Sequence, residues 1–292
     1  MFSRNLSLFD EAKRSKIKLN GFISVILSII MIFVGQIIGQ IFLIFLSQFI
    51  SIQGIMVKPI YLIFTFLFPL LLCFIWVKLV EKRRIGSLGL SSYKFVSKFF
   101  IGFFIGFLMF SAVTLLMYIT GTIEIDQNID VGINYFPAIL AILPGWILQS
   151  STEEIITRGW LMHIIGAKHR PIIGFIVSSI LFGVLHIFNP GVTYLSIMNI
   201  ILVGFFFGLY VIKTQDVWSA CGLHAAWNFT QGNIFGFSVS GGSILSTDTL
   251  MSFTSQGGDI LTGGAFGPEA SIFSTIVLII GILVLILRKH FN

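Results

Sequence analysis

Residues 99–120 read FFIGFFIGFLMFSAVTLLMYIT, and this stretch contains no charged side chain. A helix of about 20 apolar residues is long enough to cross the hydrocarbon core of a bilayer. Seven further apolar stretches lie near residues 22–50, 57–79, 134–157, 172–188, 192–212, 217–237 and 271–288. The sequence therefore predicts an all-α, polytopic membrane protein with about eight transmembrane helices.

The composition of the whole chain agrees with a bilayer environment. Of 292 residues, 56% are hydrophobic and 10% are charged, and the mean hydropathy is +0.99. Soluble globular domains carry about 25% charged residues, so a soluble enzyme is excluded. The two cysteines, Cys73 and Cys221, lie inside apolar stretches, which excludes a disulfide framework and a zinc site built on cysteine.

The basic residues predict the orientation of the helices. Cytoplasmic loops of membrane proteins carry an excess of Lys and Arg. If eight spans place both termini in the cytoplasm, all of the 18 Lys and Arg residues except Lys58 fall on the inner side. We therefore expect a multi-pass protein of the cell membrane, and nucleic acid is not an expected partner, because these residues flank apolar segments and face anionic lipid headgroups.

The chain divides into three expected parts. Residues 1–133 hold the first three spans, residues 134–237 hold the next four, and residues 238–292 hold an outer loop and the last span. The loop, from about 238 to 270, is rich in Gly, Ser and Thr. We expect it to lie on the outer side of the membrane, with part of it re-entering the bilayer. No second soluble domain is expected.

Small and polar residues within the spans predict how the helices pack. Pairs of glycines four residues apart allow helices to approach closely. These pairs are Gly35 with Gly39, Gly102 with Gly106, and Gly204 with Gly208. In the first span, Gln36 and Gln40 indicate either a polar face or a break in the helix.

Ionisable and polar residues interrupt three of the apolar spans. They lie in the segments STEEIITR (151–158), LFGVLH (181–186) and HAAWN (224–228). A charged residue at the centre of a transmembrane helix costs roughly 2.5 to 3.5 kcal/mol on insertion scales, so such residues are functional candidates. At about 1.5 Å per residue, the three segments reach overlapping heights above the inner ends of their spans. The sequence predicts that they meet near the middle of the membrane.

The spacing of these residues separates two carboxylates. Glu154 and Arg158 are four residues apart with the acid first, which is the favourable order for an ion pair on a helix. Glu153 points roughly 100° away from Glu154, so it is left available for chemistry. His224 and Asn228 are also four residues apart, and one helix face therefore presents both.

Taken in order, the three motifs resemble those of the CPBP family of intramembrane proteases, also called the Abi or CAAX-protease family. The motifs are Glu-Glu-x-x-x-Arg (153–158), Phe-x-x-x-His (182–186) and His-x-x-x-Asn (224–228). The resemblance covers roughly residues 135–235 and makes residues 134–237 a CPBP-like catalytic core. It implies an all-helical membrane endopeptidase related to the Ras-converting CAAX endopeptidases and to bacterial proteins linked to bacteriocin self-immunity. The substrate, prenylated or otherwise, stays open.

The resemblance and the residue types together imply the roles in catalysis. Glu153 is expected to act as general base on a water molecule, with His186 helping to position that water. Asn228 and His224 can donate hydrogen bonds to the oxyanion of the tetrahedral intermediate. The supporting residues are Glu154, Arg158 and Phe182.

Two ways of activating the water remain open. Glu153, His186 and His224 would make a zinc set with an open fourth position. However, no His-Glu-x-x-His pair occurs on one helix. We favour a metal-free site without a firmly bound cofactor, and zinc is the alternative.

Two other functions compete with proteolysis. Buried Glu, His and Arg also form proton relays in proton- or ion-coupled transporters, although no pair of corresponding broken helices is evident. A non-catalytic bacteriocin-immunity membrane protein could retain the same residues for packing. For the protease, the sequence suggests the hypothesis that a membrane-associated peptide or protein substrate reaches the site from the cytoplasmic side.

Overall fold

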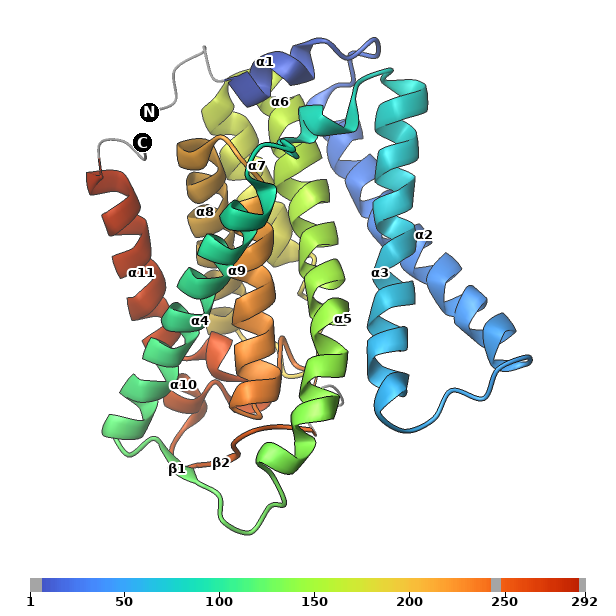
Figure 1. Ribbon diagram of the computed structural model, residues 1–292. Helices are drawn as coiled ribbons and strands as arrows, with labels where there is room; N and C mark the ends of the chain where they lie inside the picture. The colour runs from blue at the N-terminus through green and yellow to red at the C-terminus, as the bar shows by residue number, and fades with distance from the viewer. Residues whose placement is uncertain (1–6, 243–247, 289–292) are drawn as a thin grey trace.

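The structure, a computed structural model, describes residues 7–242 and 248–288 as a bundle of helices (Figure 1). It is 74% helical. Five helical segments in the described residues are long and apolar enough to cross a membrane: Gly21–Ser47, Gly54–Val80, Phe95–Ile119, Ile133–Lys168 and Tyr194–Thr214. Two apolar helices, Pro171–Val184 and Ile272–Leu287, are shorter. The predicted helical membrane class is confirmed in this form, while the count of eight spans and the orientation of the termini stay predictions.

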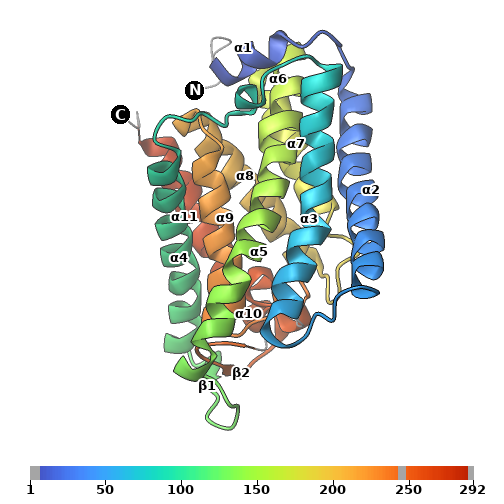
Figure 2. The ribbon, with the colours of Figure 1, turned by 45° about the vertical axis from the view of Figure 1, so that its right-hand side comes forward.

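Successive long helices alternate in direction through the bundle (Figures 1 and 2). Three π-helical turns in the described chain, η2 (Trp76–Val80), η5 (Ile155–Met162) and η6 (Thr230–Ile234), continue α3, α5 and α9. The α-helices are α1 (Ser7–Lys13), α2 (Gly21–Ser47), α3 (Val57–Ile75), α4 (Phe95–Ile119), α5 (Phe136–Glu154), α6 (His163–Lys168), α7 (Pro171–Val184), α8 (Tyr194–Thr214), α9 (Trp218–Phe229), α10 (Asp259–Thr262) and α11 (Ile272–Leu287).

Local side-chain chemistry sets where the helices begin. The side chain of Asn20 accepts a hydrogen bond of 2.7 Å from the backbone N–H of Ile23 and so caps α2. Thr193 and Ser196 form a reciprocal capping box at the start of α8. From Gly21, α2 runs without a break to Ser47, so Gln36 and Gln40 mark a polar face and not an interruption.

The glycine pairs lie where helices approach closely, as the sequence predicts. A Cβ atom on Gly102 would overlap the carbonyl oxygen of Ser219 on α9. One on Gly39 would overlap the carbonyl oxygen of Phe64 on α3, and one on Gly204 would lie 2.7 Å from the carbonyl oxygen of Ser179 on α7. The pairs therefore join α4 to α9, α2 to α3 and α8 to α7 within one chain.

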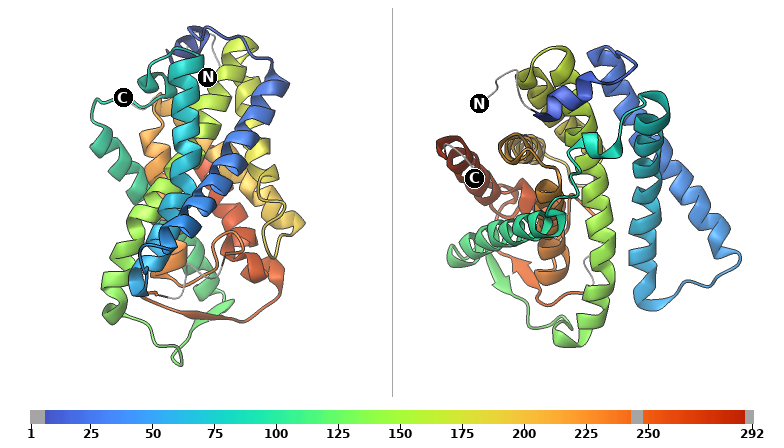
Figure 3. Two further views of the ribbon diagram at one scale, coloured as in Figure 1. Left: turned by 90° about the vertical axis from the view of Figure 1, so that its right-hand side faces the viewer. Right: turned by 45° about the horizontal axis from the view of Figure 1, so that its top comes forward.

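The two ends of the bundle differ in charge. We call the end with α1, α6 and residues 81–94 and 213–217 the basic end; α1 lies across it (Figures 1 and 3). We call the opposite end, with residues 120–135, 236–242 and 248–271, the sheet end, after the antiparallel strands β1 (Ile123–Ile125) and β2 (Phe253–Ser255) that pair there. Acidic residues at the sheet end are Glu124, Asp126, Asp130, Asp248, Asp259 and Glu269.

The expected outer loop at 238–270 folds against the bundle in its described part. It forms β2, α10 and the short 3-10 helix η9 (Pro268–Ala270), and Phe266 is fully buried. Asn199 on α8 donates hydrogen bonds of 2.7 and 2.9 Å to the carbonyl oxygens of Glu269 and Ser271. Residues 243–247 of this loop, and the basic residues Arg4 and Lys289, lie outside the described residues.

Candidate active site

The structure brings all seven predicted site residues into one region of the bundle. Glu153 and Glu154 end α5, and Arg158 lies on η5 directly after them. His186 follows the end of α7, which carries Phe182. The remaining two, His224 and Asn228, lie on α9. Three segments that are distant in the sequence therefore contribute to one site.

The predicted ion pair of Glu154 and Arg158 is present and fully buried. Nη1 of Arg158 lies 2.8 Å from Oε1 of Glu154. The same carboxylate oxygen lies 3.1 Å from Nδ1 of His224, so Glu154 fixes the imidazole as well as the guanidinium. With Nδ1 held in this way, Nε2 of His224 is directed towards Glu153.

The ring of Phe182 joins the cation to the histidines. The guanidinium carbon of Arg158 lies 4.2 Å from the centre of this ring, which is within the range of a cation–π contact. The ring centroids of His186 and His224 lie 5.1 and 5.8 Å from that of Phe182. Phe182 thus packs between three of the predicted polar groups.

The two oxygens of the Glu153 carboxylate have different surroundings. Oε1 accepts a hydrogen bond of 2.6 Å from Nε2 of Gln149, one helical turn earlier. Oε2 has no hydrogen-bond partner within the described residues and lies 4.0 Å from Nε2 of His224. The Glu153 side chain is 16% exposed and that of Glu154 is 0% exposed, so Glu153 is the carboxylate with access to the pocket.

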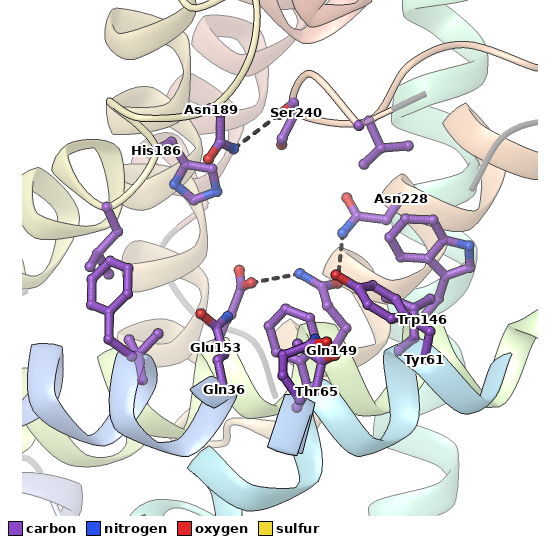
Figure 4. Close-up of a pocket in the computed structure, with 18 of the residues that line it drawn as sticks. Gln36, Tyr61, Thr65, Trp146, Gln149, Glu153, His186, Asn189, Asn228 and Ser240 are labelled. Atoms are coloured by element: carbon purple, nitrogen blue, oxygen red, sulfur yellow. Dashed lines mark hydrogen bonds between the residues drawn. The ribbon is translucent and has the colours of Figure 1, made fainter. Parts of the chain in front are cut away.

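Gln149, which was not among the predicted site residues, links two of them. Its amide nitrogen holds Glu153, and its amide oxygen accepts a hydrogen bond of 2.9 Å from Nδ2 of Asn228 (Figure 4). The signal was a second polar side chain four residues before Glu153 on the same apolar span. The second contact of Nδ2 of Asn228, to Oγ of Ser150, is long at 3.5 Å.

His186 is oriented by the backbone of its own segment. Its Nδ1 lies 2.7 Å from the carbonyl oxygen of Phe182. When Nδ1 donates this hydrogen bond, Nε2 is the nitrogen left for the pocket. In Figure 4 the ring of His186 lies across the pocket from Asn228 and on the same side as Glu153.

A pocket of about 700 Å³ contains these groups. Its walls come from α2, α3, α5, α9, the chain at the end of α7 and residues 239–242. Most side chains from α2 and α3 are apolar, but Gln36, Gln40, Tyr61 and Thr65 also line the pocket (Figure 4). Nε2 of Gln40 donates a hydrogen bond of 2.7 Å to Oγ1 of Thr65.

A third carboxylate, Glu269, lies beside the pocket and was also missed. It is 4% exposed, and its Oε2 accepts a hydrogen bond of 2.8 Å from Oγ of Ser240, which lines the pocket. Burial raises the pKa of Glu269 from its ordinary value of 4.5 to about 7. The carbonyl oxygen of Ser240 accepts a hydrogen bond of 2.9 Å from Nδ2 of Asn189. These contacts tie residues 239–242 to the chain that follows His186.

The donor geometry does not fit the zinc set that the sequence left open. Within residues 7–242 and 248–288, no three His, Cys, Asp or Glu side chains are grouped closely enough to hold a metal ion. No step of the mechanism proposed below therefore uses a metal.

The match to a protein family agrees with the motifs. Residues 135–230 match the model of a family described as type II CAAX prenyl endopeptidase Rce1-like. No curated protein matches the chain. The matched segment is about a third of the chain and contains all seven predicted site residues, together with Gln149. The resemblance seen in the three motifs is confirmed for this segment.

Proposed function

Residues 135–230 match the model of the Rce1-like family of type II CAAX prenyl endopeptidases, and from this premise we propose that the chain is a CAAX-type intramembrane endopeptidase. It hydrolyses a peptide bond of a membrane-associated substrate, either prenylated or of the bacteriocin type. Its place of action is the cell membrane. Residues 1–133 and 238–292 lie outside the matched segment, and they supply the α2–α3 wall and the 239–242 rim of the pocket.

One observation carries this proposal. Glu153 lines the pocket, and its buried Oε2 has no hydrogen-bond partner in the described chain, while Oε1 is held by Gln149. A carboxylate fixed through one oxygen can accept a proton through the other, and general-base catalysis requires a base within hydrogen-bond reach of the proton that it removes. A water molecule between Glu153 and the substrate carbonyl group would meet this requirement.

The reaction that we propose proceeds through a tetrahedral intermediate. Glu153 takes a proton from water, and the resulting hydroxide bonds to the carbonyl carbon of the scissile peptide. The negative charge moves to the carbonyl oxygen, where Asn228 and His224 donate hydrogen bonds. Glu153 then delivers its proton to the leaving nitrogen as the C–N bond breaks. His186 orients the water, and Gln149 holds Glu153 and Asn228 in register.

Replacement of Glu153 by Gln tests this function. The amide keeps the shape of the side chain but cannot accept the proton, and loss of a general base costs about 10²- to 10⁴-fold in rate. We expect comparative peptidomics of cells with wild-type and Glu153→Gln protein to show cleavage products in the wild type alone. Protein level and topology should be the same in both.

The matched control is Glu124→Gln, an isosteric change on the exposed strand β1, which should leave the products unchanged. If the same products persist in Glu153→Gln, the protease proposal fails, and transport or a non-catalytic immunity role becomes the working hypothesis. Repeating the comparison after exhaustive chelation tests the metal-free mechanism. Zinc bound in stoichiometric amount and required for turnover would contradict it.

A further inference from the structure

The pocket extends from the catalytic residues towards the sheet end of the bundle. Along α2, which starts at the basic end, the lining residues run from Ile32 to Ile44. At about 1.5 Å per residue these positions span roughly 18 Å of the helix. Along α3, which starts at the sheet end, they run from Tyr61 to Phe66. Both helices therefore contribute the parts that lie nearer the sheet end.

The remaining rim comes from the same end. Asn189 and Pro190 follow α7, and residues 239–242 belong to the sheet end. Among the described residues, no side chain of α1, α6, residues 81–94 or residues 213–217 lines the pocket. The pocket is therefore bounded by the sheet end and not by the basic end.

Packed side chains separate the basic end from the catalytic pocket; a pocket of about 170 Å³ between α1, residues 15–19 and α6 shares no lining residue with it. Phe9 of α1 is 1% exposed, and a Cβ atom on Gly166 of α6 would overlap its ring. The same ring meets the edge of His163 with a centroid distance of 5.2 Å. Deeper in the bundle, Nε1 of Trp160 donates a hydrogen bond of 2.8 Å to the buried carboxylate of Glu81. Dense packing of this kind leaves no passage for a peptide chain.

The charges indicate which side of the membrane each end faces. The basic end carries Lys and Arg on its loops, and such residues are enriched on the cytoplasmic side. Residues 120–135, 236–242 and 248–271 of the sheet end contain no Lys or Arg, and Lys58, at the start of α3, is paired with Asp248 of this end. The basic end is thus assigned to the cytoplasm, and the sheet end, towards which the pocket extends, to the outer side.

We propose that the active site receives its substrate from the outer side of the membrane, as an apolar peptide segment that reaches the bilayer from outside the cell. The substrate class rests on the function proposed above; the side of access does not. Side chains such as Phe33, Ile37 and Ile41 line the pocket and suit an apolar segment. Gln36 makes no side-chain hydrogen bond within the described residues, so its amide is available to the unpaired backbone of an extended peptide. This assignment reverses the cytoplasmic access suggested by the sequence.

Thiol labelling tests the proposal. It is done on spheroplasts, which are intact cells stripped of their walls, and on inverted membrane vesicles. The parent chain is a suitable background, because Cys73 and Cys221 are both 0% exposed. Gln36→Cys and Tyr61→Cys place a thiol in the pocket. Two controls mark the ends: Ser92→Cys at the basic end, and Gln127→Cys in the exposed chain between β1 and α5 at the sheet end. The probe is a sulfonated maleimide that does not cross membranes.

We expect both pocket cysteines to react in the intact cells together with Gln127→Cys, and Ser92→Cys to react only in inverted vesicles. Labelling of the pocket cysteines from the Ser92 side, or from neither side, would overturn the proposal. A reversed pattern of the two controls would overturn it as well, because the basic end would then face outwards. Labelling does not require cleavage, so repeating it in Glu153→Gln separates a wrong route from a wrong function.

Discussion

At the scale of single residues, the site depends on two neighbouring carboxylates that serve different purposes. Glu154 is fully buried and receives both Arg158 and His224. Glu153 lies against the pocket and keeps one oxygen free. The buried ion pair stabilises the bundle and also orients the imidazole of His224. Mutation of its two members can therefore separate the effect on stability from the effect on catalysis.

Removal of the cation should show this separation. Arg158→Met leaves the buried Glu154 carboxylate without its counter-charge, and breaking a buried pair in this way costs about 3 to 5 kcal/mol. We expect a large fall in the thermal unfolding temperature of the purified protein and a loss of cleavage. The double variant Glu154→Gln/Arg158→Met removes both charges and should regain most of the stability. It should stay inactive, because His224 loses its anionic partner; full recovery of activity would contradict the assigned role of Glu154.

Local sequence spacing predicts part of this site and misses the rest for a physical reason. The Glu154–Arg158 pair lies within one helical segment, so residue spacing alone predicts it. The hydrogen bond from Asn228 to Gln149 joins α9 to α5, and the contact of Ser240 with Glu269 joins two loop segments. Such contacts depend on tertiary packing, which the period of a single helix does not reveal.

At the scale of elements, the contact between α4 and α9 positions half of the site. Gly102 of α4 and Gly222 of α9 let the two backbones approach so closely that a Cβ atom on either would overlap a carbonyl oxygen of the other helix. The same α9 carries His224 and Asn228. A change on α4 should therefore reach the catalytic residues through the packing of the helix, without any contact with substrate.

Gly102→Val should test this coupling. The added side chain must push α4 away from α9, and overpacking of this kind costs about 1 to 3 kcal/mol. We expect lower thermal stability and a clear fall in cleavage, because α9 shifts relative to Glu153. The matched control is Gly86→Ala, where an added Cβ meets no atom within 4 Å. If the two variants unfold and cleave alike, α4 does not position the site.

The π-helical turns are a feature of the helices that the sequence pattern does not predict. The spans were predicted with a regular period of 3.6 residues, but η5 follows Glu154 directly and continues to Met162. A π-turn adds a residue to the helical repeat and is common near functional sites. The hydrophobic pattern predicts that a segment is helical but does not distinguish α from π geometry, and all eight residues of η5 are buried.

At the scale of the whole molecule, the chain combines a closed basic end with a pocket that extends to the sheet end. The part of the chain that follows α9 completes the fold by packing residues 236–242 and 248–271 against the helices. Glu269 is buried in this layer and accepts a hydrogen bond from Ser240 through its carboxylate. Asn199 of α8 binds its backbone carbonyl group. The protonation state of this one buried carboxyl group should therefore be visible in the stability of the entire protein.

The sign of the pH effect follows from the raised pKa of Glu269. Burial raises this pKa from 4.5 to about 7, so the folded protein keeps the proton in a range where the unfolded chain has lost it. The stabilisation is complete below about pH 4.5 and is lost as the pH rises to about 7. At about 1.4 kcal/mol per pKa unit, the loss is roughly 3 kcal/mol. We expect the thermal unfolding temperature of the wild type to fall across this range, and Glu269→Gln to remove that part of the slope. Glu124→Gln, an exposed change of the same kind on β1, should keep it; equal slopes for wild type and Glu269→Gln would show that Glu269 is already ionised in the folded protein.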